Sequence, residues 1–205
     1  MTKVLYINAS PRGEIAASTQ AAQQFVDALS PDIQVQHLNL FDAQLPEFTA
    51  ELARAKQKYA MGQAMDAAEG SQWQAVLALV EQFVSADHYL FGVPMWNFSV
   101  PYKLKQYIDL ITHPGLTFTR DAQGMRGLAE GGATVIYARG GNYSPKDGKP
   151  DPFDFQSPYL QAWLGLVGIN PVEEILVQTT MAGPDAQSQS LEGASPALRA
   201  AAQRL

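Results

Sequence analysis

Three hydroxyl side chains and one guanidinium lie near the start of the chain, and groups of this kind bind anions. Ser10, Arg12, Ser18 and Thr19 belong to the stretch VLYINASPRGEIAAST at positions 4–19. Its last residues would supply the free amides of a helix start, which favour a phosphate. The stretch has neither a Gly-Lys-Ser/Thr ending nor a G-x-G-x-x-G pattern. It therefore predicts a phosphate cup of another kind, or else only a turn at Ser10 and a helix that Ser18 caps.

A second stretch, GVPMWNFSVP at positions 92–101, combines apolar and aromatic side chains with two prolines that stiffen its ends. Met95, Trp96 and Phe98 would offer a surface to a flat hydrophobic partner, and Asn97 is the strongly polar side chain among them. The same residues are compatible with a loop packed against the core, which is a common place for Trp.

A third stretch, Arg139-Gly140-Gly141-Asn142, places two glycines side by side. Adjacent glycines allow the backbone to approach a ligand closely, and their amides can form a nest for partial negative charge. They are also compatible with a simple turn.

Five short apolar runs predict buried strands at positions 4–7, 33–40, 88–93, 133–138 and 172–178. The run at 33–40 alternates apolar and polar residues, so we expect it near a sheet edge. A 3.6-residue apolar period predicts helices at 18–29, 71–83, 101–113 and 157–166, and a last helical segment around 195–196. Ser71-Gln72-Trp73-Gln74 matches a capping box that would start the second of these helices. The polar, Ala-rich residues 46–70 are expected to form a helical excursion.

Strands that alternate with helices predict an α/β fold, in which right-handed crossovers build a parallel sheet covered on both faces. Such a sheet binds ligands beyond the carboxyl ends of its strands. The loops at 8–17, 94–99 and 139–157 follow the first, third and fourth strands, so the three stretches should meet at one edge. Residues 143–155 would be either a lid over substrate or a simple insertion.

The composition argues against several other classes of function. A formal net charge of −6 disfavours nucleic acid and anionic membranes as partners, because both need a basic face. Without cysteine the chain has no thiolate nucleophile or thiolate metal site, and its three histidines lack metal-ligand spacing, so no metal is expected. We also expect a single domain over residues 1–205 and a cytoplasmic location, since no signal peptide and no run near the ~20 residues of a membrane span is visible.

Taken together, S-P-R-G…A-A-S-T, P-M-W-N-F and A-R-G-G resemble, in order and separation, the FMN-dependent NADH:azoreductases, which also reduce quinones. The resemblance runs from about Lys3 to Val177, and P-M-W-N-F is its most specific element. It implies a flavodoxin-like fold with a five-stranded parallel sheet and helices on both faces, and a homodimer with FMN at the interface in each of two sites.

The resemblance also assigns roles by motif match. Ser10, Ala16, Ala17 and Ser18 would hold the FMN phosphate, Met95, Trp96, Asn97 and Phe98 would line the ring, and Arg139, Gly140 and Gly141 would approach its pyrimidine side. The substrate would meet Phe98, Asn142 and Phe118, the last supplied by the partner subunit. The family commonly has Ser-x-Ser in the phosphate loop, whereas position 16 is Ala here, which predicts one hydroxyl fewer.

The implied activity is a ping-pong reaction in which NADH or NADPH reduces the flavin, and the flavin then reduces a small aromatic acceptor. Hydride passes directly between the rings, so the protein mainly positions them and no side chain is expected to act as a catalytic acid or base. Quinones and azo compounds are both planar and reducible, and the sequence does not rank them. A non-enzymatic, flavodoxin-like FMN electron carrier is the alternative, whereas a phosphate-ester hydrolase would need a nucleophile that the chain does not offer.

Overall fold

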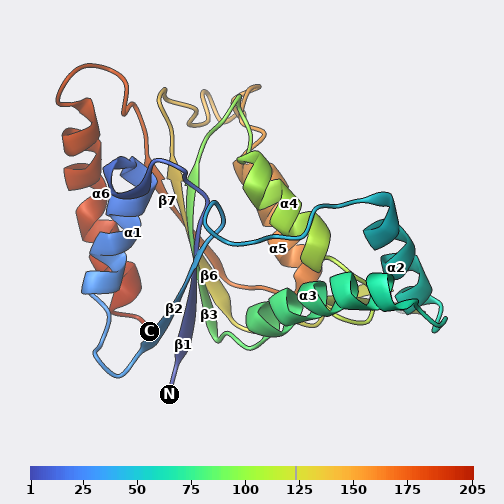
Figure 1. The fold of residues 1–205 in the computed structure, drawn as a ribbon. Coiled ribbons are helices and arrows are strands. Elements are labelled where there is room, and N and C mark those ends of the chain that lie inside the picture. The colour runs from blue at the N-terminus through green and yellow to red at the C-terminus, as the bar shows by residue number, and fades with distance from the viewer. Residues whose placement is uncertain (123) are drawn as a thin grey trace.

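The computed structural model describes residues 1–122 and 124–205, and a five-stranded parallel sheet forms its centre, with the strand order β2-β1-β3-β6-β7 (Figure 1). The strands are β1 (Lys3–Asn8), β2 (Gln34–Asn39), β3 (His88–Pro94), β6 (Gly132–Ala138) and β7 (Val172–Val177). β1 pairs with β2 on one side and with β3 on the other, so the strand order reverses between β1 and β3. The predicted five-stranded parallel α/β sheet is confirmed, and the crevice beside β1 and β3 is where such sheets bind ligands.

The register brings the carboxyl ends of the strands to one edge. Asn8 at the end of β1 lies opposite Gly92 of β3, Pro94 lies opposite Ala138 of β6, and Ala138 lies opposite Val177 of β7. The loops that follow these four strands therefore leave the sheet together. The first six of the seven residues of β3 are buried, as expected for a strand covered on both faces.

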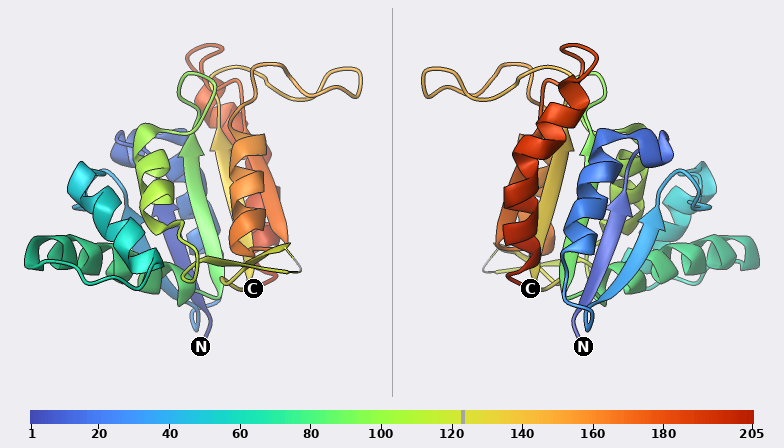
Figure 2. Two further views of the ribbon diagram at one scale, coloured as in Figure 1. Left: turned by 90° about the vertical axis from the view of Figure 1, so that its right-hand side faces the viewer. Right: turned by 90° about the vertical axis from the view of Figure 1, so that its left-hand side faces the viewer.

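Helices cover both faces of the sheet, as predicted. α1 (Ala17–Asp27) and α6 (Ala186–Ala202) pack on one face, around a buried cluster that includes Phe25 and Leu198. α3 (Ala67–Val84), α4 (Tyr102–Ile111) and α5 (Ser157–Val167) pack on the other, around a larger apolar cluster. α2 (Ala50–Ala60) packs on α3 and extends that layer away from the sheet (Figures 1 and 2).

The start of α3 differs from the sequence prediction. The helix begins at Ala67, and Asp66 caps it by accepting the amide of Glu69 at 2.9 Å, while the Glu69 carboxylate accepts the amide of Asp66 at 3.0 Å. The predicted capping box at Ser71 is therefore wrong, because Ser71 lies inside the helix. Carboxylates suit a helix start better than Ser and Gln do, and Glu69 is also paired with Lys58 at 2.6 Å.

The other predicted helices are present with shifted ends. Residues 46–70 contain α2 and the first residues of α3, and the segment around Pro196 lies within α6, which begins at Ala186. None of the helices in the described parts of the chain is both long and apolar enough to cross a membrane.

Two short strands outside the main sheet are absent from the sequence prediction. β4 (Phe118–Asp121) and β5 (Gly124–Gly127) form an antiparallel pair. Just beyond the pair, Ala129 donates its amide to the carbonyl of Val167 at 3.0 Å, and Val167 ends α5. Since α5 runs from the carboxyl edge of the sheet back to the amino edge, the β4–β5 pair lies at the amino edge.

Candidate cofactor site

A cavity of about 210 Å³ opens at the carboxyl edge of the sheet, beside the ends of β1, β3 and β6. Its lining residues come from the loop after β1, the start of α1, the loops after β3 and β6, and the segment after β7: Ser10, Arg12, Ala16, Ala17, Ser18, Pro94, Met95, Trp96, Ala138, Gly140, Thr180, Met181 and Gln187. Seven of these are predicted cofactor residues, namely Ser10, Ala16, Ala17, Ser18, Met95, Trp96 and Gly140. The structure thus brings the three stretches singled out in the sequence to one cavity.

The first wall is the turn after β1, and Asn8 organises it. The Asn8 side-chain oxygen accepts the amide of Ser10 at 3.0 Å and the hydroxyl of Thr19 at 3.5 Å. The Ser10 hydroxyl oxygen in turn accepts the amide of Arg12 at 3.3 Å. A short 3-10 turn, Gly13–Ile15, then leads into α1. Thr19 therefore supports the turn from behind rather than lining the cavity.

Ser18 has an unusual position in this wall. Its hydroxyl is fully buried and has no hydrogen-bond partner among the described residues, although Ser18 lines the cavity. An unsatisfied buried hydroxyl costs ~1–3 kcal/mol, so a hydroxyl in this place fits a ligand that accepts its hydrogen. The alternative in which Ser18 caps the helix is excluded, because the N-cap residue is Ala16, which makes no side-chain capping bond.

The first turn of α1 borders the same cavity. The first amides of an α-helix have no acceptor within the helix and carry partial positive charge. Gly92 lets α1 begin this close to the sheet, because a Cβ at that position would lie 3.3 Å from the Ser18 carbonyl oxygen and 3.4 Å from the Tyr6 ring. Together with Arg12, this wall offers hydroxyls, helix-start amides and a guanidinium, which is the donor set that a phosphate requires.

The second wall is the loop after β3, which turns back on itself. The amide of Trp96 donates to the carbonyl of Ser99 at 2.9 Å, and the amide of Ser99 donates to the carbonyl of Trp96 at 3.0 Å. Between them, Asn97 has φ +46° and Phe98 has φ +72°. Two positive φ angles define a type I′ turn, which favours Asn and Gly, so the bulky Phe98 is held in a strained conformation of the sort that gathers at ligand sites.

The third wall is the backbone at Gly140 and Gly141. Their carbonyls accept the amides of Met181 at 3.3 Å and Thr179 at 3.1 Å, so the segment after β7 continues alongside the end of β6. A Cβ on Gly140 would lie 2.8 Å from the Met181 sulfur. The glycine therefore allows Met181 to lie directly against this backbone, at the edge of the cavity.

Arg139 lies next to this wall, but its guanidinium is bonded elsewhere. The side chain is 2% exposed and donates from Nε to the Gln156 amide oxygen and from Nη2 to Asp154 Oδ2, both at 3.0 Å. Burial by itself raises the pKa of Asp154, but hydrogen bonds from Ser157 and the charge of Arg139 outweigh it and hold the pKa below its usual value. The backbone of Arg139 leads into the cavity wall, whereas its side chain belongs to a buried ionic network.

Several other predicted residues lie outside the cavity lining. Asn97 and Phe98 are exposed on the turn beyond Trp96, and Gly141 lies against the ring of Tyr143. Asn142 is exposed, and its side-chain oxygen accepts the amide of Ser144 at 2.9 Å. Phe118 begins β4 and is therefore at the opposite edge of the sheet from the cavity.

The segment after β7 and the start of α6 supply lining residues that the sequence analysis missed. These are Thr180, Met181 and Gln187, and Pro94 and Ala138 complete the missed set. The Gln187 amide donates to the Ile15 carbonyl and to the Gln20 side chain, both at 3.1 Å, which ties α6 to the loop after β1. A usable signal existed, because the fifth strand of a parallel sheet ends at the same edge as the others.

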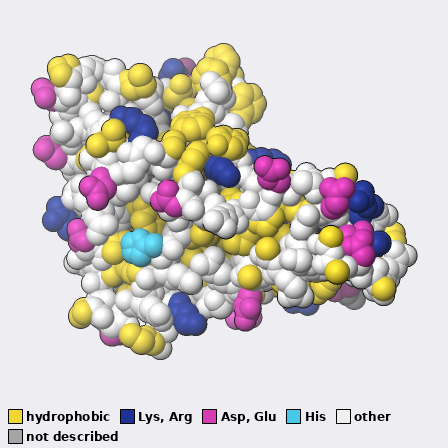
Figure 3. All heavy atoms as spheres, viewed as in Figure 1, with side chains coloured by type: hydrophobic (Ala, Val, Ile, Leu, Met, Phe, Trp, Pro, Cys, Tyr) yellow, Lys and Arg dark blue, Asp and Glu magenta, His cyan; other side chains and the backbone are white. Residues whose placement is uncertain are grey.

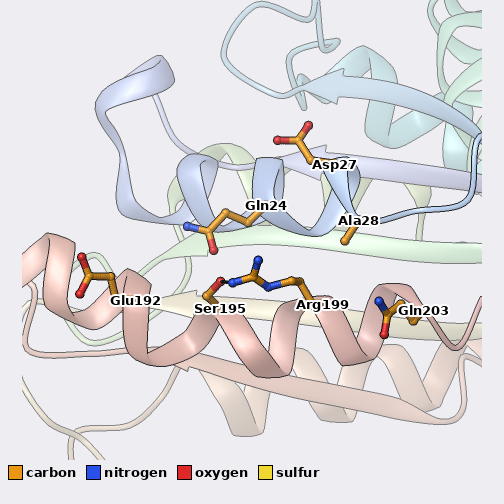
Figure 4. Close-up of a pocket in the computed structure, with 7 residues that line it drawn as sticks. All are labelled: Gln24, Asp27, Ala28, Glu192, Ser195, Arg199 and Gln203. Atoms are coloured by element: carbon orange, nitrogen blue, oxygen red, sulfur yellow. Dashed lines mark hydrogen bonds between the residues drawn. The ribbon is translucent and has the colours of Figure 1, made fainter.

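A roomier groove of about 530 Å³ lies between α1 and α6 (Figure 4). Its lining is polar and of mixed charge: Asp27, Glu192 and Arg199 contribute to it, and Arg199 donates to the Ser195 hydroxyl at 2.7 Å. The groove lies in the helical layer away from the strand ends and includes none of the predicted site residues. Size alone therefore does not identify the site, and the smaller cavity at the carboxyl edge is the better candidate.

Hydrophobic side chains gather on the surface beside the cavity. Figure 3 shows them in the upper middle of the face, over the region where α4 begins in Figure 1. Phe48, Phe98 and Tyr102 are exposed by 48%, 42% and 61%. A second hollow of about 550 Å³ uses Phe48 and Tyr102 together with Trp96, which also lines the cavity. The apolar surface is therefore continuous with the candidate site.

Comparison with known proteins gives matches along the whole chain. The model of the family described as having a flavodoxin-like fold matches residues 2–202. An FMN-dependent NADH:quinone oxidoreductase of Nitratidesulfovibrio vulgaris is 42% identical over 207 residues, which cover 98% of this chain and 99% of the relative. FMN-dependent NADH:quinone oxidoreductase 3 of Pseudomonas fluorescens is 38% identical, covering 100% of this chain and 98% of the relative.

Solved structures of similar proteins also match this chain along its whole length. An FMN-dependent NADH-azoreductase from Bacillus anthracis, determined in complex with FMN, has a TM-score of 0.88 and 28% identity, covering 100% of this chain and 99% of the other. An azoreductase from Bacillus anthracis strain Sterne has a TM-score of 0.89 and 25% identity, and the match covers both chains completely.

Proposed function

The chain belongs to the flavodoxin-like family of FMN-dependent NADH:quinone oxidoreductases, and from this premise we propose that it binds FMN and uses NADH or NADPH to reduce quinones and azo compounds. Residues 1–205 act in this proposal as one FMN-binding domain. The location is cytoplasmic, where both nicotinamide donors are available.

The unpartnered hydroxyl of Ser18 carries the assignment of the cofactor. Ser18 lines a cavity that also meets the start of α1 and Arg12, so the residues present fit a phosphate. We assign Ser10, Ala16, Ala17 and Ser18 to the FMN phosphate. Met95, Trp96, Asn97, Phe98, Gly140, Gly141 and the backbone of Arg139 are assigned to the ring, and Phe98, Asn142 and Phe118 to the substrate.

The bound FMN supplies the chemistry, by accepting a hydride from the nicotinamide and passing the electrons to the acceptor. The protein itself binds the flavin, orients it against the substrates and shields it from water. Met95, Trp96 and Met181 give the cavity lining apolar side chains against which a flat ring can pack. The glycine backbone at 140–141 permits a close approach, and its amides can stabilise negative charge on a ring placed against them. No acid or base is needed from a side chain.

We further propose that the active form is a homodimer. The exposed aromatic residues beside the cavity form a surface of the kind that subunit interfaces cover. Phe118 lies at the amino edge of the sheet, so within one subunit it is far from the cavity and only a partner subunit can bring it to the site. Activity should then require the dimer, and dilution below its dissociation constant should abolish turnover. Full activity in a demonstrated monomer would contradict this arrangement.

The cofactor is tested by releasing it. Purified protein should be yellow and should release FMN rather than FAD on denaturation, since the proposed phosphate cup is short and the sequence has no second nucleotide motif. Chromatography against FMN and FAD standards identifies the flavin. Recovery of FAD would overturn the assignment.

The enzyme activity is tested by NADH oxidation in the presence of a quinone. Turnover separates an oxidoreductase from a flavodoxin-like carrier, which would bind FMN and yet oxidise NADH poorly. If NAD(P)H and acceptor alternate at one open face of the ring, double-reciprocal plots at several fixed acceptor concentrations should be parallel. Intersecting lines would contradict the ping-pong order.

A further inference from the structure

Arg139 connects two parts of the structure that would otherwise be independent. Its guanidinium is almost fully buried at the end of β6 and forms two hydrogen bonds of 3.0 Å to Asp154 and Gln156, at the far end of the long loop after β6. It also lies over the Tyr137 ring, with 5.1 Å between the guanidinium carbon and the ring centroid. Residues 143–156 extend from the upper edge of the sheet in Figure 2, and Arg139 is one of the residues that bind their far end.

The two partners of Arg139 are themselves fixed. Asp154 accepts the amide of Ser157 at 3.0 Å and its hydroxyl at 2.7 Å, which secures it to the start of α5. Gln156 is fully buried and donates its side-chain amide to the carbonyl of Val93 at 3.1 Å. The network therefore links β3, β6 and α5 at the point where residues 143–156 return to the body of the protein.

This anchored end of the loop holds Phe98. The amide of Phe155 donates to the Phe98 carbonyl at 3.0 Å, and the Phe98 ring lies 5.0 Å from that of Phe153 and 6.2 Å from that of Tyr143. Phe98, Tyr143 and Phe153 form what we call the rim cluster, and Tyr143 also lies against Gly141 beside the cavity. A left-handed backbone conformation at a Phe persists only where neighbouring groups stabilise it. For Phe98 these groups are the amide of Phe155 and the rings of Phe153 and Tyr143.

We propose that Arg139 is a positioning residue for the acceptor: its guanidinium fixes the end of residues 143–156 and, through Phe155, holds the rim cluster where a planar acceptor extends beyond the flavin. The inference rests on the proposed function. It gives the backbone and the side chain of Arg139 different roles: the backbone contributes to the cofactor site, and the side chain positions the acceptor. Acceptors with two fused rings should depend on the rim cluster more than acceptors with one ring, because only the larger ones reach it.

The test compares Arg139→Met with wild type in three measurements. The ratio of kcat/KM for a two-ring naphthoquinone to that for a one-ring benzoquinone should fall roughly three- to tenfold, the equivalent of one lost aromatic contact. The dissociation constant of FMN, from fluorescence quenching in apo-protein, should stay within about twofold, since Arg139 is not a lining residue of the cavity and Phe98 is one of several residues assigned to the ring. Trypsin should cut after Lys146 faster in the variant, because the far end of residues 143–156 loses two of its hydrogen bonds, and mass spectrometry identifies the fragments 1–146 and 147–205.

Further variants guard against a simple folding defect. Removing Arg139 alone leaves Asp154 as a buried unpaired charge, so the double variant Arg139→Met with Asp154→Asn is made as well, and it should show the same change in acceptor ratio. Arg139→Lys keeps a charge for Asp154 but cannot bond Asp154 and Gln156 as a fork, so it should recover the ratio only partly. Lys149→Met removes one exposed cation from the same loop and should leave all three measurements unchanged.

The proposal is overturned if folded variants keep the wild-type acceptor ratio and cleavage rate. It is also overturned if FMN affinity falls as much as the acceptor ratio, because the side chain would then serve the cofactor. If wild-type protein does not oxidise NADH with any quinone, the proposed function is wrong, and the cleavage rate still decides whether Arg139 anchors the loop.

Discussion

Ser18→Ala should weaken FMN binding and yet leave the stability of the apo-protein unchanged or slightly higher. In most buried positions a serine hydroxyl has a partner within the protein, so its removal destabilises the fold. The Ser18 hydroxyl has none among the described residues, and Ser18 lines the cavity at the start of α1. Its removal therefore deletes no protein–protein hydrogen bond, but it does delete a donor to the proposed FMN phosphate.

The magnitudes follow from the charge of the acceptor. A hydrogen bond to a charged group contributes ~1.5–3 kcal/mol, so the dissociation constant of FMN should rise roughly 10- to 100-fold. The unfolding free energy of the apo-protein should stay within about 1 kcal/mol of wild type, or exceed it, because a desolvated hydroxyl is removed. Fluorescence quenching on titration of FMN measures the first quantity, and urea unfolding of apo-protein measures the second.

Thr134→Val is the matched control, because the Thr134 hydroxyl is also buried but bonds His88 Nε2 at 3.1 Å and lies four residues before the end of β6. This variant should lose about 1 kcal/mol of stability and keep its FMN affinity. If Ser18→Ala instead behaves like the control, with lower apo stability and unchanged FMN affinity, the Ser18 hydroxyl is structural and the phosphate lies elsewhere.

Three other variants test the site and the fold. Ala16→Ser should add the hydroxyl that the family's Ser-x-Ser supplies and tighten FMN binding about fivefold in the same titration, the equivalent of ~1 kcal/mol. Gly140→Ala should raise the FMN dissociation constant several-fold with little loss of stability, because its Cβ would meet the flexible, largely exposed Met181 side chain at 2.8 Å and displace it from the cavity wall. Burial holds the pKa of His88 at about 4, so the unfolded state takes up a proton first as the pH falls below 6.5. Wild-type protein should therefore lose about 3 kcal/mol of stability between pH 6.5 and about 4, and a pH series of urea unfolding with His88→Gln should show that this loss disappears.

The strands were predictable where burial on both faces leaves an unbroken apolar run. β3 is such a strand, and its bounds follow from composition alone. The β4–β5 pair could not be found in this way, since each strand has four residues and both are largely exposed. The start of α3 was missed for a different reason, because the sequence contains two overlapping capping patterns, one at Asp66 and one at Ser71. The pattern at Asp66 is favoured by the ion pair between Glu69 and Lys58, and α2 brings Lys58 close only in the folded protein.

The cavity was predictable in outline because parallel strands bring their following loops to one edge. This rule places Ser10, Met95 and Gly140 together without any knowledge of distances. The same rule, applied to the fifth strand, would also have indicated Thr180 and Met181. Their residue types alone do not indicate a binding site. Gln187 is harder, because it reaches the cavity from a helix and its partner is a carbonyl far away in the chain.

Arg139 shows where inference from a motif ends. A motif such as A-R-G-G assigns a whole residue to a ligand, but a residue at the end of a buried strand has a backbone that continues along the sheet and a side chain that leaves it sideways. The backbone and the side chain of Arg139 have different partners. The backbone forms hydrogen bonds with the end of β7 and the segment after it, and the guanidinium forms hydrogen bonds with Asp154 and Gln156. Those partners lie 15 and 17 residues further along, in a loop without periodicity, so no sequence pattern links them to Arg139. A long cationic side chain at that position is explained by the end of the loop that it binds, so changes in this loop should alter the preference for acceptors and leave the FMN site unchanged.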